Sequence, residues 1–158
     1  MIKLKNLTVR NFLSVGKVSQ ALKFDQHGLT LVLGNNMDLG GDGSRNGTGK
    51  TTIVNALSYV LYGNALTNIR KDNLINKTNS KNMLVTCEFE SEGHSYRIER
   101  GRKPNILRFI VDDQESAQGE TEEQQGENKE TQADIERMLG MGHDMFKHIV
   151  ALNTYTEP

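Results

Sequence analysis

Residues 44–52 read Ser-Arg-Asn-Gly-Thr-Gly-Lys-Thr-Thr and carry most of the phosphate-binding pattern G-x-x-x-x-G-K-[ST]. In such a loop, glycines let consecutive backbone N–H groups turn towards phosphate oxygens, and the helix that follows adds partial positive charge. The pattern places Lys50 at the β- and γ-phosphates of a nucleotide and the Thr51 hydroxyl on Mg²⁺. The sequence therefore predicts a nucleotide-binding loop formed by Asn46, Gly47, Thr48, Gly49, Lys50, Thr51 and Thr52.

One position of this loop departs from the pattern. Ser44 stands six residues before Lys50, where the pattern has glycine. We interpret the difference as an insertion of roughly eight to ten residues between a strand that ends at Gly34 and the loop itself. The part that handles phosphate is intact under this interpretation.

The segments on both sides of the loop have the expected periodicity. Residues 28–34 are apolar on both faces and end in glycine, which is typical of a buried strand. Residues 49–62 predict a helix that ends at Gly63. Its apolar stripe is expected to consist of Ile53, Val54, Leu57, Val60 and Leu61.

The rest of the chain predicts an α/β fold with a mixed β-sheet, a P-loop helix and a following antiparallel hairpin region. Strands are expected at 2–9, with a bulge at Lys5-Asn6, and at 18–24. Further strands are expected at 83–89, 95–100 and 106–111. Helices are expected at 131–139, with a capping box formed by Thr131 and Asp134, and at 143–152.

The distribution of charge is more informative than its sum. The chain has 19 Lys and Arg, 20 Asp and Glu, and a formal net charge of −1. Residues 1–111 hold 16 basic against 8 acidic side chains, whereas residues 112–136 hold one lysine against 10 acids. Residues 112–130 contain a single apolar residue, Ala117, and predict an acidic flexible insert within a domain that spans residues 1–158.

Basic residues of the folded part gather in two places: Arg70, Lys71, Lys77 and Lys81, and then Arg97, Arg100, Arg102 and Lys103. A solvated surface and contact with a phosphate backbone are both open interpretations of these clusters.

Asp112 and Asp113 follow the apolar run 107–111 and offer a second interpretation of that segment. Asp112 would then be a Walker B acid, and the chain a self-contained small P-loop kinase or NTPase. The alternation of Leu107, Phe109 and Val111 favours a half-exposed hairpin strand instead.

Other classes of protein find little support in the composition. The single cysteine, Cys87, excludes a disulfide framework. No apolar run approaches the roughly 20 residues of a membrane span, and the first residues lack the apolar segment of a signal peptide. The sequence predicts a cytoplasmic protein without a membrane partner.

The order of these features resembles the N-terminal half of an SMC-type ABC ATPase head. The matching residues are 7–14, the strand that ends at Gly34, the loop 46–52 and the helix that ends at Gly63. Within this class the chain is similar to the SbcC-type ATPases of double-strand-break repair. Residues 74–76, 100–105 and 135–141, with Phe146-Lys147, resemble the phage recombination endonuclease ATPase subunits of that group.

This resemblance implies that the ligands are ATP and Mg²⁺ and that the chain is one half of a head. The signature motif, Walker B and the catalytic acid would lie in a C-terminal half beyond a coiled coil, so no catalytic residue is expected in this fragment. Two heads would join on ATP binding and regulate an SbcD-type nuclease on DNA ends. Many relatives carry Arg or Lys where this chain has Leu13. The Q-loop position, a further Mg²⁺ ligand, falls at Thr154 or alternatively at Asn153.

Overall fold

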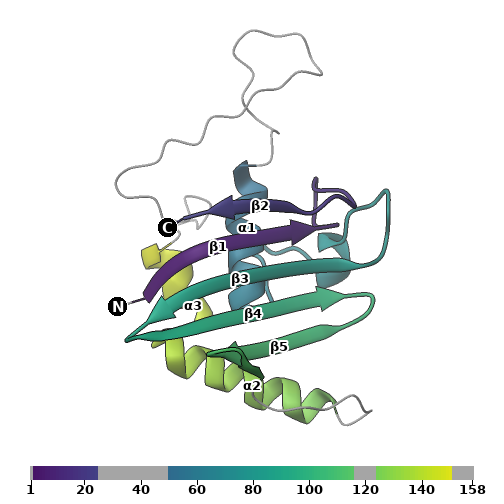
Figure 1. The fold of residues 1–158 in the computed structure, drawn as a ribbon. Helices are drawn as coiled ribbons and strands as arrows, with labels where there is room; N and C mark the ends of the chain where they lie inside the picture. The colour runs from purple at the N-terminus through teal and green to yellow at the C-terminus, as the bar shows by residue number, and fades with distance from the viewer. Residues whose placement is uncertain (1, 25–49, 116–123, 151–158) are drawn as a thin grey trace, which may run out of the picture.

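The computed structural model describes residues 2–24, 50–115 and 124–150. Six strands form one sheet in the order β2-β1-β3-β4-β5-β6, and every pairing between them is antiparallel (Figure 1). The strand predicted at 28–34 lies outside the described residues. The bounds of the strands are β1 Ile2–Arg10, β2 Gln20–Lys23, β3 Met83–Ser91, β4 His94–Arg102, β5 Ile106–Val111 and β6 Gln114–Glu115.

The register of the sheet follows the alternation in the sequence. Cys87 pairs with Ile98, and both side chains are fully buried on the face that the helices cover. The pairing of β1 with β3 shifts between Leu4 and Asn6, which confirms the predicted bulge. Beyond the bulge Leu7 and Val9 turn into the core, so the extra residue sets which side of β1 is buried.

The P-loop helix is α1, Lys50–Tyr62. Gly63 ends it with a φ of 80°, and its N–H donates to the Tyr59 carbonyl at 2.7 Å, so the predicted stop is confirmed. The predicted apolar stripe is only partly right. Val60 and Leu61 are buried, but so are the polar residues Thr52, Asn55 and Ser58, because α1 is enclosed on nearly every side.

The second long helix begins earlier than the sequence indicates. Helix α2 spans Gln124–Leu139, so the capping box predicted at Thr131 and Asp134 is wrong and both residues lie within the helix. Gln, Glu and Lys favour helix, and their propensity extends α2 through a segment without an apolar stripe. The acidic stretch 112–130 is therefore helical in its last seven residues, and 116–123 lie outside the described residues.

Short elements complete the described part of the chain. The 3₁₀-helix η1 spans Lys71–Leu74, the short helix α3 spans His143–Met145, and the π-helix η2 spans Phe146–Val150. The last two replace the single helix predicted at 143–152.

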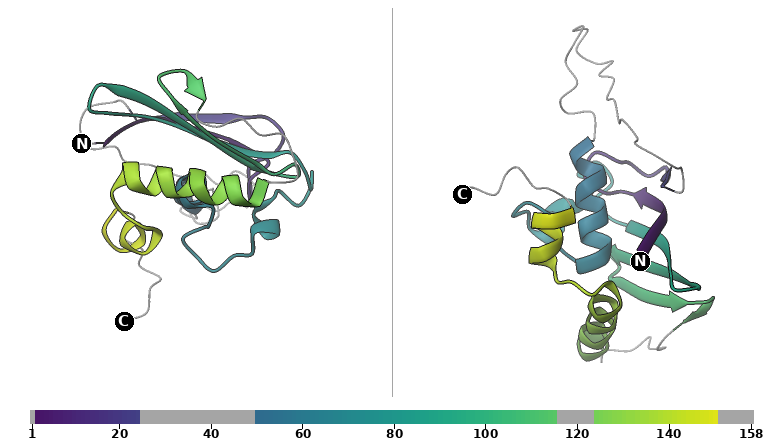
Figure 2. Two further views of the ribbon diagram at one scale, coloured as in Figure 1. Left: turned by 90° about the horizontal axis from the view of Figure 1, so that it is seen from below. Right: turned by 90° about the vertical axis from the view of Figure 1, so that its left-hand side faces the viewer.

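The core lies between the sheet and the helices, all of which cover one face of it (Figure 2). Among the residues that the structure describes, no helix combines the length and the apolar character needed to cross a membrane. The fully buried large side chains come from β1, the loop after it, η1, β3, β4 and α2: Leu7, Phe12, Leu74, Met83, Phe89, Ile98 and Ile135.

Candidate functional site

The candidate site lies at the first turn of α1. Residues 46–49 and the side chain of Lys50 lie outside what the structure describes, so the loop itself stays a prediction. Helix α1 begins at Lys50, and the first N–H groups of a helix have no partner within it. These donors and the helix dipole favour an anion at this end of α1.

The two threonines of the first turn have different environments. The Thr51 side chain is exposed, whereas Thr52 is only 8% exposed. The Thr52 Oγ1 lies 3.2 Å from the Ser14 Oγ, so this hydroxyl is used in a contact within the protein. The exposed Thr51 hydroxyl makes no hydrogen bond to another described residue, so the donor set at this turn fits a magnesium-bound nucleotide.

Ser14 belongs to a tight loop, residues 11–16, that links β1 to β2. Asn11 and Leu13 both adopt a φ of 49°, in the left-handed region that residues with side chains rarely occupy. The Asn11 N–H donates to the Gly16 carbonyl at 2.9 Å and closes the loop. Such strained conformations persist only where the surroundings hold them, and here they bring Ser14 to Thr52.

An asparagine cluster holds this loop from the segment before β3. Asn76 donates its backbone N–H to the Asn11 carbonyl and its side-chain Nδ2 to the Leu13 carbonyl, both at 2.9 Å. Asn79 Nδ2 donates to Asn11 Oδ1 at 2.9 Å, and Asn11 Nδ2 reaches the Asn82 carbonyl at 3.3 Å. The cluster therefore fixes the two residues of positive φ.

Phe12 fastens the loop to α1. Its side chain has no exposed surface, and its ring centroid lies 5.6 Å from that of Tyr59. The next residue, Leu13, donates its N–H to the Leu74 carbonyl at 2.7 Å. The position of Ser14 at the start of α1 thus depends on the core as well as on the asparagine cluster.

The sequence pointed to none of these supporting contacts. Ser14 and the asparagines carry no pattern that points to a partner distant in the sequence. The available signal was the spacing of Asn73, Asn76, Asn79 and Asn82 at every third residue. Such a run favours turns whose side chains bond to nearby backbone.

Asp112 does not have the environment of a Walker B acid. It lies in the turn between β5 and β6 with a φ of 49°. Its Oδ1 accepts the Ser95 N–H at 2.8 Å and its Oδ2 lies 2.6 Å from His94 Nδ1. These bonds hold the pKa of the exposed carboxyl below its usual value, the Ser95 N–H having the larger effect. The structure favours the hairpin interpretation of this segment.

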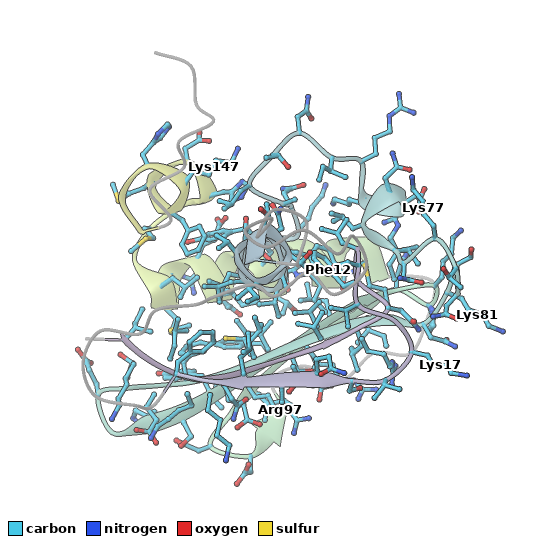
Figure 3. The ribbon with its side chains drawn as sticks, turned by 90° about the horizontal axis from the view of Figure 1, so that it is seen from above. Phe12, Lys17, Lys77, Lys81, Arg97 and Lys147 are labelled. Atoms are coloured by element: carbon cyan, nitrogen blue, oxygen red, sulfur yellow. The ribbon has the colours of Figure 1, made fainter. Side chains whose placement is uncertain are left out.

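The structure brings the two basic clusters together only in part, since Lys71 lines a cavity with Arg100 and Arg102 but the other members lie elsewhere. Arg97 pairs with Glu99 at 2.6 Å, and it lies across the sheet from Phe12 (Figure 3). Arg102 pairs with Asp72 at 2.6 Å, and Arg100 points under the sheet towards α1. Lys77 and Lys81 lie on the same side of the molecule as Lys17 in the view of Figure 3.

The remaining predicted ligands cannot be placed. Thr154 and Asn153 both lie outside the described residues. Within residues 2–24, 50–115 and 124–150, no group of three His, Cys, Asp or Glu side chains could hold a metal ion. Of the predicted Mg²⁺ ligands, Thr51 is the one that lies within the described residues.

The antiparallel sheet covered by a P-loop helix defines the class of protein as the N-terminal half of an ABC-type ATPase head. The chain belongs to the AAA domain family, whose profile matches residues 6–155. Its structure is similar to a solved chain described under "Structural biochemistry of ATP-driven dimerization and DNA stimulated activation of SMC ATPases". The match covers 98% of this chain and 93% of the solved chain. That match has a TM-score of 0.56 at 15% identity and shows the fold.

Two relatives make the resemblance more specific. The chain is 33% identical over 152 residues to "Exonuclease subunit 2" of Enterobacteria phage T4, which covers 96% of this chain and 24% of the relative. It is 33% identical over 97 residues to "DNA double-strand break repair Rad50 ATPase" of Thermoplasma volcanium, covering 61% of this chain and 9% of the relative. The chain thus spans about a quarter of the length of its phage relative.

Proposed function

We propose that this chain is the ATP-binding half of a DNA repair or recombination ATPase that regulates a partner nuclease on DNA ends. The observation that carries the proposal is the similarity to a phage exonuclease subunit over 96% of the chain. The SMC-type fold and the start of α1 at Lys50, directly after the Gly-Thr-Gly of the P-loop, support it.

Each residue of the site has a definite task in this proposal. In this proposal the chain would bind ATP together with Mg²⁺, and the metal would supply positive charge that neutralises the phosphates. The loop 46–49 and the first turn of α1 orient the phosphates through backbone N–H groups, and Lys50 neutralises their charge. Thr51 holds the metal, and Thr154, or alternatively Asn153, provides the second oxygen. Ser14 keeps Thr52, and with it the first turn of α1, in place.

Hydrolysis needs parts that this half-head does not supply under the proposal. A C-terminal half-head of the same protein would complete the domain, and two such heads would engage across bound ATP. The nuclease subunit would be of the SbcD type, and the complex would act in the cytoplasm, which for a phage protein is that of the host. Residues 1–158 would form one half-head, with 112–130 as an acidic insert.

Nucleotide binding tests the first part. We expect the chain to bind a fluorescent ATP analogue with Mg²⁺, and Lys50→Ala to weaken the affinity at least tenfold. Thr51→Val should reduce the gain in affinity that Mg²⁺ gives. Lys77→Ala, which removes an exposed lysine outside the loop, is the matched control. Equal affinities for Lys50→Ala and the unaltered chain would refute the P-loop assignment.

Turnover tests the second part. The 158 residues alone should release phosphate from ATP negligibly, whereas joining a C-terminal half-head should give DNA-dependent turnover. Multiple turnovers by the chain alone that disappear in Lys50→Ala would instead establish the self-contained NTPase. Such turnover would be consistent with nucleotide binding at the P-loop. It would overturn only the proposal that hydrolysis requires a separate C-terminal half-head.

A further inference from the structure

A second concave site lies at the opposite end of α1. A cavity of about 440 Å³ opens between the last turn of α1, the turn that joins β4 to β5, and helix α2. Small-molecule sites commonly have volumes of about 300–1,000 Å³. The 13 residues of α1 place this cavity about 20 Å from the P-loop, at 1.5 Å per residue. The two sites are therefore separate.

The walls of this cavity, which we call the α1–α2 pocket, are basic. Among the described residues that line it, four carry positive charge and one, Glu136, carries negative charge. The Nε of Arg102 forms an ion pair with Asp72, whose side chain is 61% exposed. The basic residues come from three elements, η1, β4 and α2: Lys71, Arg100, Arg102 and Lys129.

Arg100 is held in a fixed position in this wall. Its Nε donates to the Val60 carbonyl at 3.1 Å and its Nη2 to Gln132 Oε1. Gln132 in turn donates to the Leu61 carbonyl at 3.1 Å, so both side chains cap the carbonyl end of α1. Burial lowers the pKa of Arg100 to about 10, which leaves the guanidinium charged at neutral pH.

This capping role uses only part of the guanidinium. Arginine has five N–H donors, and the bonds to Val60 and Gln132 use two of them. No carboxylate within the described part of the chain forms an ion pair with Arg100. A buried cation without a paired anion is costly, so the wall favours an anion that enters the cavity.

Tyr59 supplies an unused donor in the same wall. The residue is only 3% exposed, and its hydroxyl makes no hydrogen bond with any described residue. Every fully enclosed side-chain N or O atom of the described residues has a partner, so this hydroxyl is not fully enclosed, and Tyr59 is one of the residues that line the cavity. Burial raises its pKa to about 12, against the effect of Arg100 and Arg102, and keeps the proton on the oxygen.

We propose that the α1–α2 pocket binds a small phosphate-bearing anion. A phosphate group has several acceptor oxygens, and these suit a guanidinium, two ammonium groups and a phenol that converge from different sides. The volume accommodates a group from free phosphate to a mononucleotide. The site is independent of the P-loop, since none of the described residues that line it belongs to the loop 46–52, and α1 separates the two.

The test uses the chain with Lys50→Ala, which weakens phosphate binding at the P-loop. Inorganic phosphate, pyrophosphate and AMP are titrated separately into ¹⁵N-labelled protein at constant ionic strength. We expect saturable shifts of the Gly63, Gly101 and Gln132 amide signals with at least one of the three. The anion that binds with the highest affinity shows whether the pocket prefers a free phosphate anion or a nucleotide.

Variants locate the binding. Tyr59→Phe removes only the hydroxyl, and Lys129→Ala removes an exposed charge from α2. Each should weaken binding at least fivefold with the remaining amide spectrum unchanged, whereas Lys77→Ala should bind normally. The proposal is overturned if none of the three anions gives saturable shifts, or if both pocket variants bind as tightly as the control. Neither result would alter the assignment of the P-loop, which the ATP titration tests on its own.

Discussion

Phe12→Ala should detach the loop 11–16 from α1 and lower the stability of the whole domain. Phe12 has no exposed surface, and an aromatic side chain buries on the order of 200 Å². At about 25 cal/mol per Å² this burial contributes about 5 kcal/mol, of which the alanine methyl retains a part. The ring contact with Tyr59 at 5.6 Å adds about 1 kcal/mol. We expect a loss of about 4 kcal/mol, within the roughly 3–5 kcal/mol typical of buried Phe→Ala changes.

Urea unfolding followed by circular dichroism measures this loss. Val18→Ala is the matched control, because Val18 is an apolar side chain in the same connection but is 66% exposed, and it should change stability by less than about 0.5 kcal/mol. Phe12→Leu should lose less than Phe12→Ala because it refills most of the volume. A loss below about 1 kcal/mol for Phe12→Ala would refute the view that Phe12 anchors the loop.

Four further changes test other parts of the structure. Asn79→Ala leaves Asn11 without one partner and should cost about 1–2 kcal/mol in urea unfolding. Gly101→Ala places a Cβ 2.5 Å from the Met83 carbonyl oxygen, so it should lower the melting temperature more than Gly142→Ala, where the space is open. Cys87 is buried and its pKa is raised to about 12, so a thiol reagent at pH 8 should label it only after unfolding. Burial lowers the pKa of His143 below 6.5, so stability should fall as the pH drops below 6.5, and His143→Gln should flatten that slope.

Local signals predicted much of this fold correctly. The end of α1 could be predicted from one residue, because Gly63 adopts a positive φ without the steric cost that a Cβ would add. The bulge in β1 and the hairpin strands β3 to β5 follow from alternation over neighbouring residues. Each of these features depends on residues that are close together in the sequence.

The side-chain contacts that support the site could not be predicted from local sequence patterns. The bond between Asn11 and Asn79 joins residues 68 apart, and that between Ser14 and Thr52 joins residues 38 apart. A sequence pattern reports the type of each side chain but not the partner that folding brings to it. For the same reason the sequence does not reveal the partners of the polar residues Asn55 and Ser58 in α1, both of which are buried. They are buried because Asn55 accepts the Leu66 N–H at 2.9 Å and Ser58 donates to the Asn64 carbonyl at 2.7 Å.

The number of basic residues likewise overstates how many positive charges are available at the surface. Residues 1–111 hold an excess of eight positive charges, which by itself indicates a strongly basic surface. Arg97 and Arg102 are paired with carboxylates, and Arg100 is turned inward against the carbonyl end of α1. Fewer cations are therefore available for a phosphate backbone than the count implies. Since each phosphate contact steepens the dependence of DNA affinity on salt, a measured slope well below that for eight contacts is the expected result. A slope that matched eight contacts would mean that these ion pairs open when DNA binds.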